Sequence, residues 1–166
     1  DMTGCDATDS AYGVGEAISI TCTFDEAVTV TGTPTITLSN SDVASYASGS
    51  GSANIVFTTT IAEDDTASTD LSVSSIQTTA GGATMKDAAG NAADTTIVGG
   101  DLGTVTVDGD APDLVSVVDA GDTALGVGET HIITVTWDEA VVTANGALSL
   151  SNGGTAVYTS GTTTAA

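Results

Sequence analysis

Apolar and polar side chains alternate strictly along residues 18–24, the most regular stretch of the chain. Ile18, Ile20, Cys22 and Phe24 share one face, and one serine and two threonines between them share the other. A period of two residues predicts a β-strand with one face in a core. No stretch sustains the 3.6-residue period of an amphipathic helix, so we expect an all-β protein.

Further short strands are expected on both sides of this one. Gly, Asn, Ser and Asp, which favour turns, separate them. Short strands in this number, within about 110 residues, are typical of an immunoglobulin-like antiparallel β-sandwich. The predicted strands cover residues 2–5, 18–24, 27–31, 35–39, 43–47, 54–61, 71–76 and 103–107.

The strand at 18–24 lies in a segment that the chain contains twice. GVGEAISITCTFDEAV at residues 13–28 returns as GVGETHIITVTWDEAV at residues 126–141, 113 residues later. When residues 5–28 are aligned with 118–141 without a gap, about 15 of 24 positions are identical. Self-similarity at a long fixed period is the mark of a tandem repeat. The sequence therefore predicts one complete repeat of about 113 residues and half of a second copy.

This period divides the chain into three segments. We expect a complete sandwich repeat at residues 1–108, an acidic linker at 109–113, and the N-terminal half of a second repeat at 114–166. The half repeat alone would expose an apolar face and open sheet edges, which native proteins avoid. Strand addition by a neighbouring subunit would complete it, and so would further sequence of the same polypeptide. Because the chain starts with Asp rather than Met, we expect a processed or excised piece of a longer protein.

Charge narrows the choice of partners. Twenty-two acidic residues stand against Lys86 and no arginine, which gives a net charge of -21. Binding to nucleic acid needs Lys and Arg to neutralise phosphates, so it is excluded. No apolar run approaches the roughly 18 residues of a membrane span. A chain of this charge attracts cations, which fits either calcium ligation or a general acidic bias for a saline habitat.

Calcium is the only site chemistry that the residues support, because it takes six to eight oxygen ligands, several of them carboxylates. In a sandwich of this order, the loops after the first strand and after residues 54–61 meet the linker at one end of the repeat. Asp138 and Glu139, which repeat Asp25 and Glu26, would approach the same junction from the second copy. The alternative is that these are turn and capping residues on a solvated acidic surface. The candidate calcium ligands are Asp6, Asp9, Glu16, Glu63, Asp64, Asp65, Asp108, Asp110, Asp113, Asp138 and Glu139.

Two smaller features belong with this inventory. Residues 87–91 (DAAGN) favour a tight turn over a second loop of oxygen ligands. Glycines that recur in both copies of the GVGE segment indicate turn positions with unusual backbone angles.

The two cysteines predict a disulfide. Cys5 and Cys22 both lie in the first copy, and the second copy has Val118 and Val135 in their places. Antiparallel pairing of the first two strands would bring the two cysteines side by side. An even cysteine count in a chain that otherwise looks extracellular favours a disulfide, and two buried free thiols are the alternative.

An enzyme is not expected. His131 is the sole histidine, and its counterpart in the first copy is the core position Ile18. One lysine and no arginine leave no clamp for a phosphate, and the glycines form no phosphate-binding loop. The acidic pairs at residues 63–65 could serve glycoside hydrolysis, but no aromatic platform accompanies them.

The motifs GVGEAISITCTFDEAVTVTGTPTITL, DAAGNA and VTVDGDAPDLV resemble the tandem immunoglobulin-like repeats of large bacterial and archaeal surface proteins, adhesins and filament-forming proteins. The resemblance implies display outside the cell or on its surface, repeats stacked end to end, and junctions stiffened by calcium. The cysteine pair is uncommon in such repeats.

Together these observations predict a non-enzymatic structural protein of an extracellular filament, fibre or surface layer. Its partners would be copies of itself or further repeats of the same polypeptide, and the half repeat could polymerise it by strand complementation. The alternative is the stalk of a large cell-surface adhesin, which binds a host, surface or glycan ligand elsewhere in the protein.

Overall fold

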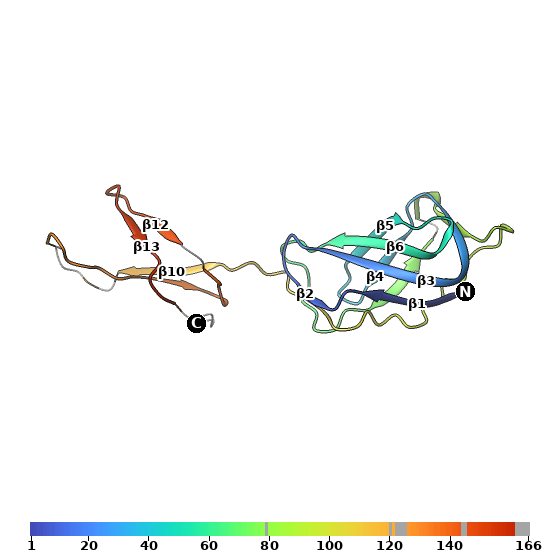
Figure 1. Cartoon of the computed structure of the whole chain (residues 1–166), viewed down its shortest axis with the longest axis horizontal. Coiled ribbons are helices and arrows are strands. Elements are labelled where there is room, and N and C mark those ends of the chain that lie inside the picture. The colour runs from blue at the N-terminus through green and yellow to red at the C-terminus, as the bar shows by residue number, and fades with distance from the viewer. Residues whose placement is uncertain (79, 120, 122–125, 144–145, 162–166) are drawn as a thin grey trace. The chain divides into compact units, whose positions relative to one another are not determined.

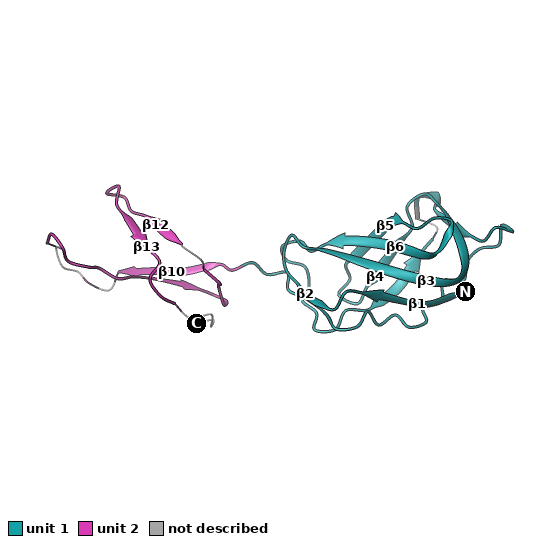
Figure 2. Cartoon of the chain, viewed as in Figure 1, with its two compact units in different colours: residues 1–111 teal, residues 112–166 magenta. Residues whose placement is uncertain are grey.

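The computed structural model describes residues 1–78, 80–119, 121, 126–143 and 146–161 (Figure 1). The chain divides into two compact units, Asp1–Ala111 (unit 1) and Pro112–Ala166 (unit 2), coloured separately in Figure 2. The division falls within the predicted linker at residues 109–113. Each unit is described by itself.

The all-β expectation is confirmed. Among the described residues the only helical element is a short 3-10 turn, η1 (Ala80–Gly82). No helix in this part of the chain is long and apolar enough to cross a membrane. The strands of unit 1 are β1 (Met2–Ala7), β2 (Ser10–Tyr12), β3 (Ala17–Thr31), β4 (Thr35–Leu38), β5 (Val43–Ser48), β6 (Ser52–Thr60), β7 (Val73–Gln77), β8 (Thr84–Lys86) and β9 (Val105–Val107).

The main sheet of unit 1 is antiparallel and has the order β1-β3-β6-β5-β4-β7, with β8 paired to the far part of β3. Strand β2 pairs in parallel with β9. Strand β9 in turn lies beside the segment that leads into β7, because the Leu71 amide donates to the Val105 carbonyl at 2.9 Å. The antiparallel bridge between Ser68 and Val107 continues this contact.

Strand β3 differs from the sequence prediction. The strands expected at 18–24 and 27–31 are one continuous strand of 15 residues with a register irregularity between Thr23 and Val28. The polar residues at this irregularity break the alternation of apolar and polar positions, and for this reason the sequence predicted two separate strands. The sequence also missed β2 and β8, because three residues are too few to show a period.

The core of unit 1 draws on nearly every strand. The predicted inward set of β3 is buried, with Ile18, Ile20 and Cys22 at 0% exposure and Phe24 at 2%. These side chains pack against one cluster of apolar residues from the other strands and loops. The wholly buried members from those elements are Ile36, Ala44, Ile55, Phe57, Leu71, Leu102 and Val105.

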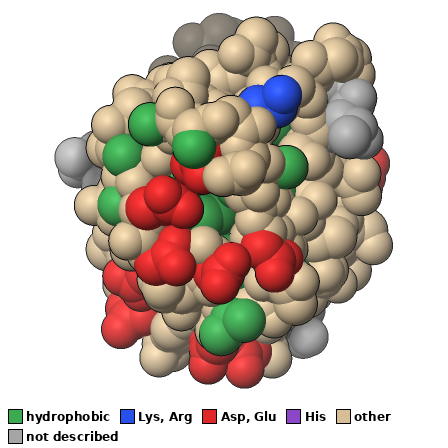
Figure 3. All heavy atoms as spheres, turned by 90° about the vertical axis from the view of Figure 1, so that its right-hand side faces the viewer, with side chains coloured by type: hydrophobic (Ala, Val, Ile, Leu, Met, Phe, Trp, Pro, Cys, Tyr) green, Lys and Arg blue, Asp and Glu red, His purple; other side chains and the backbone are tan. Residues whose placement is uncertain are grey.

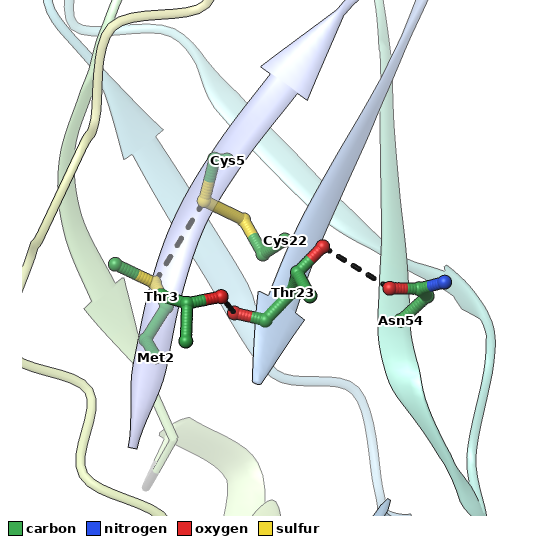
Figure 4. Close-up of a disulfide and its surroundings, with 6 residues drawn as sticks. All are labelled: Met2, Thr3, Cys5, Cys22, Thr23 and Asn54. Carbon is green, nitrogen blue, oxygen red and sulfur yellow. Dashed lines mark hydrogen bonds between the residues drawn. A yellow bond between two sulfur atoms is a disulfide. The ribbon is translucent and has the colours of Figure 1, made fainter. Parts of the chain in front are cut away.

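Cys5 of β1 and Cys22 of β3 lie opposite each other in the ladder and form a disulfide, which confirms the prediction (Figure 4). Two side-chain hydrogen bonds near the disulfide link β1 to β3 and β3 to β6. The Thr3 hydroxyl donates to the Thr23 carbonyl, and the Thr23 hydroxyl donates to Asn54 Oδ1, both at 3.1 Å. The disulfide and these two bonds tie β1, β3 and β6 together.

Unit 2 contains two antiparallel pairs: β10 (Leu114–Asp119) with β11 (Ile133–Trp137), and β12 (Ala147–Ser149) with β13 (Thr155–Val157). By the repeat they correspond to β1, β3, β4 and β5. None of the described side chains in this unit is buried. The pairs are therefore formed without the apolar interior that unit 1 has.

The register of the first strand pair differs between the units. Cys5 faces Cys22 in unit 1, whereas in unit 2 Val117 faces Val135 and Val118 faces Thr134. Relative to the repeat, β10 is therefore shifted by one residue. Such a shift turns every side chain of a strand to the other face, and register is strongly specified only where one face is buried. Unit 1 has the buried face and the disulfide, and the described residues of unit 2 have neither.

Candidate functional site

Three acidic segments meet at one end of unit 1. The turn at residues 13–16 is joined to Ile61 by two backbone bonds, from the Gly15 amide to the Ile61 carbonyl at 2.8 Å and from the Ile61 amide to the Glu16 carbonyl at 2.9 Å. The Asp64 amide donates to the Gly109 carbonyl at 2.9 Å, which joins the turn after β6 to the segment after β9. The structure thus gathers the following candidate ligands in adjoining turns: Glu16, Glu63, Asp64, Asp65, Asp108 and Asp110.

Backbone packing at this end is close. A Cβ atom on Gly109 would lie 2.2 Å from the Asp65 carbonyl oxygen, so only glycine fits there. Asp64 adopts a left-handed backbone angle, φ 69°, which Asp tolerates better than most residues. These features fix the turn at 62–65 against residue 109.

Most carboxylates in these turns accept hydrogen bonds from nearby backbone amides. Glu63 Oε1 accepts from the Ala111 amide at 3.1 Å, and Asp65 Oδ2 accepts from the Ala62 amide at 2.7 Å. Asp108 Oδ1 accepts from the Asp110 amide at 3.3 Å. Each side chain therefore closes or joins a turn, as expected if they are turn and capping residues.

The GVGE turn repeats its hydrogen bonds in both units. Glu16 Oε2 accepts from the Gly13 amide at 2.9 Å, and Glu129 Oε2 accepts from the Gly126 amide at 2.6 Å. In each copy the glutamate amide also donates back to the glycine carbonyl, at 3.1 Å and 3.2 Å. The glutamate thus closes its own turn, which gives a structural reason for its recurrence.

The prediction of unusual backbone angles is confirmed at one glycine of each copy. Gly15 has φ 84° and Gly128 has φ 91°, in the left-handed region that favours glycine. Gly13 does not share this conformation.

Two candidate ligands, Asp6 and Asp9, belong to elements other than these acidic turns. Asp6 stands inside β1, opposite Thr21 of β3. Asp9 comes directly before β2, and its Oδ1 accepts from the Thr104 amide at 2.7 Å. The sequence treated residues 6–16 as one connection, but β1 extends to Ala7 and β2 occupies the middle of that segment.

The remaining candidates, Asp113, Asp138 and Glu139, belong to unit 2. The Asp113 amide donates to Asp138 Oδ1 at 2.8 Å, and the Asp138 amide donates to the Asp113 carbonyl at 3.1 Å. Glu139 follows Asp138 beyond the end of β11 and is half-buried.

No three side chains of His, Cys, Asp and Glu are grouped closely enough to hold a metal ion in the part of the chain that is described. Calcium at the carboxylates named above stays a prediction.

A second acidic gathering occupies the other end of unit 1, seen in Figure 3, and the sequence did not predict it. It surrounds a shallow cavity of about 200 Å³. Strand β8 pairs with the end of β3, which brings the loop after β8 beside the residues that follow Phe24. These segments are far apart in the sequence, so no local sequence pattern predicts the cavity. Its lining residues are Asp1, Phe24, Glu26, Val28, Asp87, Asn91, Ala92, Ala93 and Asp94.

Asp87, at this cavity, begins the predicted turn at residues 87–91. Its Oδ1 accepts from the Asn91 amide at 2.8 Å, and its Oδ2 accepts from Asn91 Nδ2 at 2.7 Å. Gly90 has φ 91°. The side-chain bond from Asn91, followed by its backbone bond, lowers the pKa of Asp87. This is the tight turn that the sequence favoured.

In unit 2 the sole histidine contacts a carboxylate. His131 Nε2 is hydrogen-bonded to Asp119 Oδ1. The pKa of Asp119 is lowered, first by the hydrogen bond from the Gly121 amide and also by His131.

No protein-family model, curated protein or solved structure matches this chain.

Proposed function

We propose that this chain is a non-enzymatic structural segment of an extracellular filament, fibre or surface layer, built from immunoglobulin-like sandwich repeats joined end to end. The observation that carries the proposal is the recurrence of one set of hydrogen bonds in both units. Glu16 and Glu129 close equivalent turns: each accepts from the amide of the glycine three residues before it, and each donates its own amide to the carbonyl of that glycine. A module that occurs twice in one chain is typical of elongated proteins, whose repeats stack on their neighbours.

The strand pairing of unit 1 supports the immunoglobulin-like part of the proposal. That fold has strands A, B, E and D in one sheet and C, F and G in the other. With β1, β3, β4, β5, β6, β7 and β9 as A to G, the neighbours β1-β3-β6-β5 and β4-β7 follow this order. Strand β9 completes the second set through its bonds to the residues before β7. One departure is that β4 also pairs with β5, which joins the two sets at one edge.

The disulfide and the net charge support a location outside the cell. The disulfide between Cys5 and Cys22 favours an oxidising environment, where such bonds persist. A net charge of -21 keeps a chain soluble in saline surroundings and attracts cations. Calcium is kept in the proposal as the counter-ion of the acidic turns, supported by their charge.

Immunogold electron microscopy of cells of the source organism tests this function. Antibodies against unit 1 should label filaments or a layer outside intact, unpermeabilised cells, and antibody absorbed with the purified chain serves as the control. Label that appears only after permeabilisation would contradict the proposal. Label confined to isolated stalks with an unlabelled tip would favour the adhesin alternative.

A further inference from the structure

One broad face of unit 1 carries no charged side chain. Strands β3, β6 and β5 lie side by side in the main sheet, and their outward side chains form this face. Residues 17–23, 43–48 and 54–60 of these strands include no charged residue, although the chain has 22 acidic residues. We call the outward residues of these three segments the neutral face. The register places Ser19, Thr58 and Ser45 in one row across its centre, and all three are exposed.

The remaining surface of unit 1 is acidic in comparison. Turns that include Glu16 occupy one end, and the cavity beside Asp87 occupies the other. Asp70 and Asp101 are exposed on the second set of strands, close to the start of β7. At the neutral face, Asp6 of β1 lies at the margin. A molecule of the same charge therefore meets the least repulsion at the neutral face.

The two outer strands of the main sheet are covered, so a neighbour cannot pair with them. On β1, the Cys5 amide donates to the Gly99 carbonyl at 3.0 Å. On β7, the Val73 amide donates to the Gly100 carbonyl at 2.7 Å. Covered edges of this kind prevent strand addition. Another molecule must therefore contact unit 1 at an end or on a face.

The chemistry of the neutral face suits an uncharged partner. The hydroxyl groups of Ser19, Ser45 and Thr58 make no hydrogen bond within the described part of the chain. Val43 is 48% exposed and Val56 is half-buried, so methyl groups lie between the hydroxyls. A charged side chain buried against this surface would find no opposite charge and would cost free energy.

We propose that the neutral face is a lateral contact surface for a second copy of this chain, which docks with its own neutral face. Such a contact is isologous, which means that the same residues of both copies meet around a twofold axis. It leaves the acidic turns of both copies in solvent. The inference rests on the proposed function and deepens it, because it names the contact that holds neighbouring filaments or the molecules of a layer side by side.

The size of the neutral face predicts a weak contact. Three strands about 4.8 Å apart, with about seven residues in each, cover roughly 300 Å². A stable interface buries about 800 Å² on each partner. Single chains should therefore associate only at high concentration, whereas two rows of repeats would add many such contacts together.

Paramagnetic NMR detects weak contacts of this kind between copies. A nitroxide is attached to Ser48→Cys, at the margin of the neutral face, and this chain is mixed with an isotope-labelled chain of the natural sequence. Sodium chloride at about 1 M screens the repulsion between the acidic turns. We expect the amide signals of residues 17–23, 43–48 and 54–60 to broaden most. A nitroxide on Ser74→Cys of β7 is the matched control and should broaden no segment preferentially.

Two variants of the isotope-labelled chain locate the contact. Ser19→Glu places a charge at the centre of the neutral face and should weaken the association by more than about tenfold, because that charge would be buried unpaired. Ser74→Glu makes the same change at an exposed serine of β7 and should leave the association within about twofold.

Broadening spread evenly over the chain would overturn the inference, because it would report random collisions. Broadening centred on unit 2 or on the acidic ends would also overturn it, since the second copy would then dock there. An association that Ser19→Glu leaves unchanged would do the same. Surface labelling of cells does not depend on contacts between purified chains. Failure of this contact is therefore distinguishable from failure of the proposed function.

Discussion

The backbone of Asp113 and the side chain of Asp138 hold the start of unit 2 to the end of its second strand. The Asp113 amide donates to Asp138 Oδ1 at 2.8 Å, and the Asp138 amide returns a bond to the Asp113 carbonyl at 3.1 Å. In unit 1, Asp25 Oδ1 accepts from the N-terminal ammonium group of Asp1, and the Asp25 amide donates to the Asp1 carbonyl at 2.9 Å. The recurrent Asp-Glu dipeptide therefore has a structural role at its first residue in both copies.

This relationship gives the first prediction. Asp138→Ala removes the acceptor, and a hydrogen bond of this kind contributes about 1 kcal/mol. Amide hydrogen exchange at Asp113 should speed up by roughly five- to tenfold, as measured by NMR. Asp138→Asn keeps an oxygen acceptor and should exchange at nearly the original rate. Equal exchange in all three proteins would show that this contact does not order the start of unit 2.

Removal of the disulfide should destabilise unit 1 alone. The double variant Cys5→Val and Cys22→Val copies the residues of the second repeat and opens a loop with a sequence separation of 17. In the chain-entropy model this costs about 3 kcal/mol. Urea unfolding followed by circular dichroism measures the loss, and Trp137 emission in the folded protein serves as the control because it reports on unit 2. An unchanged urea midpoint would contradict this expectation.

The register of β10 can be tested by cross-linking. Since Val117 faces Val135, the pair Val117→Cys with Val135→Cys should oxidise faster than the pair Val118→Cys with Val135→Cys. Mass spectrometry of peptides cut at acidic residues identifies each disulfide, with the native bond as internal reference. Faster oxidation of the 118/135 pair would show that unit 2 already holds the register of unit 1.

The loss of folding stability at acidic pH should depend on Asn91. The hydrogen bonds from Asn91 lower the pKa of Asp87 in the folded state, so their contribution is present above the usual aspartate pKa. It is lost as the pH falls through the lowered folded-state value. Asn91→Ala should raise the pKa of Asp87, measured by carboxyl NMR, and reduce the loss of stability on acidification. Asn152→Ala in unit 2 is a control that should leave the pKa of Asp87 unchanged.

Calcium should stabilise the chain if the acidic turns bind it. A ligand that binds only the folded state adds about 2.7 kcal/mol at a hundred times its Kd, so the melting temperature should rise with calcium concentration. Calorimetry with calcium, with magnesium at equal ionic strength and with chelator measures this. Identical melting curves in the three conditions would leave the carboxylates as turn and capping residues on a salt-adapted surface.

The all-β class, the inward face of β3 and the disulfide could all be predicted from the amino-acid sequence alone. Each depends on a local period or on a pairing between neighbouring strands. Ile18, Ile20, Cys22 and Phe24 alternate because a pleated strand has one buried face, and antiparallel pairing then brings Cys5 beside Cys22. The recurrence of Gly15 as Gly128 likewise predicted a turn with a left-handed backbone angle, because glycine adopts that angle more easily than other residues.

The positions of the carboxylates and their contacts could not be predicted in this way, because they depend on pairing between strands that are far apart in the sequence. The sequence placed Asp9 in the connection after the first strand but did not indicate its partner. Strand β2, which follows Asp9, pairs with β9 nearly a hundred residues away, and this pairing brings Asp9 to the Thr104 amide. The cavity beside Asp87 arises in the same way, from the pairing of β8 with β3. The register of β10 is also a tertiary outcome. Residues 114–118 (LVSVV) carry apolar side chains on both faces of the strand, so each of two registers offers an apolar face, and a buried face must select one of them.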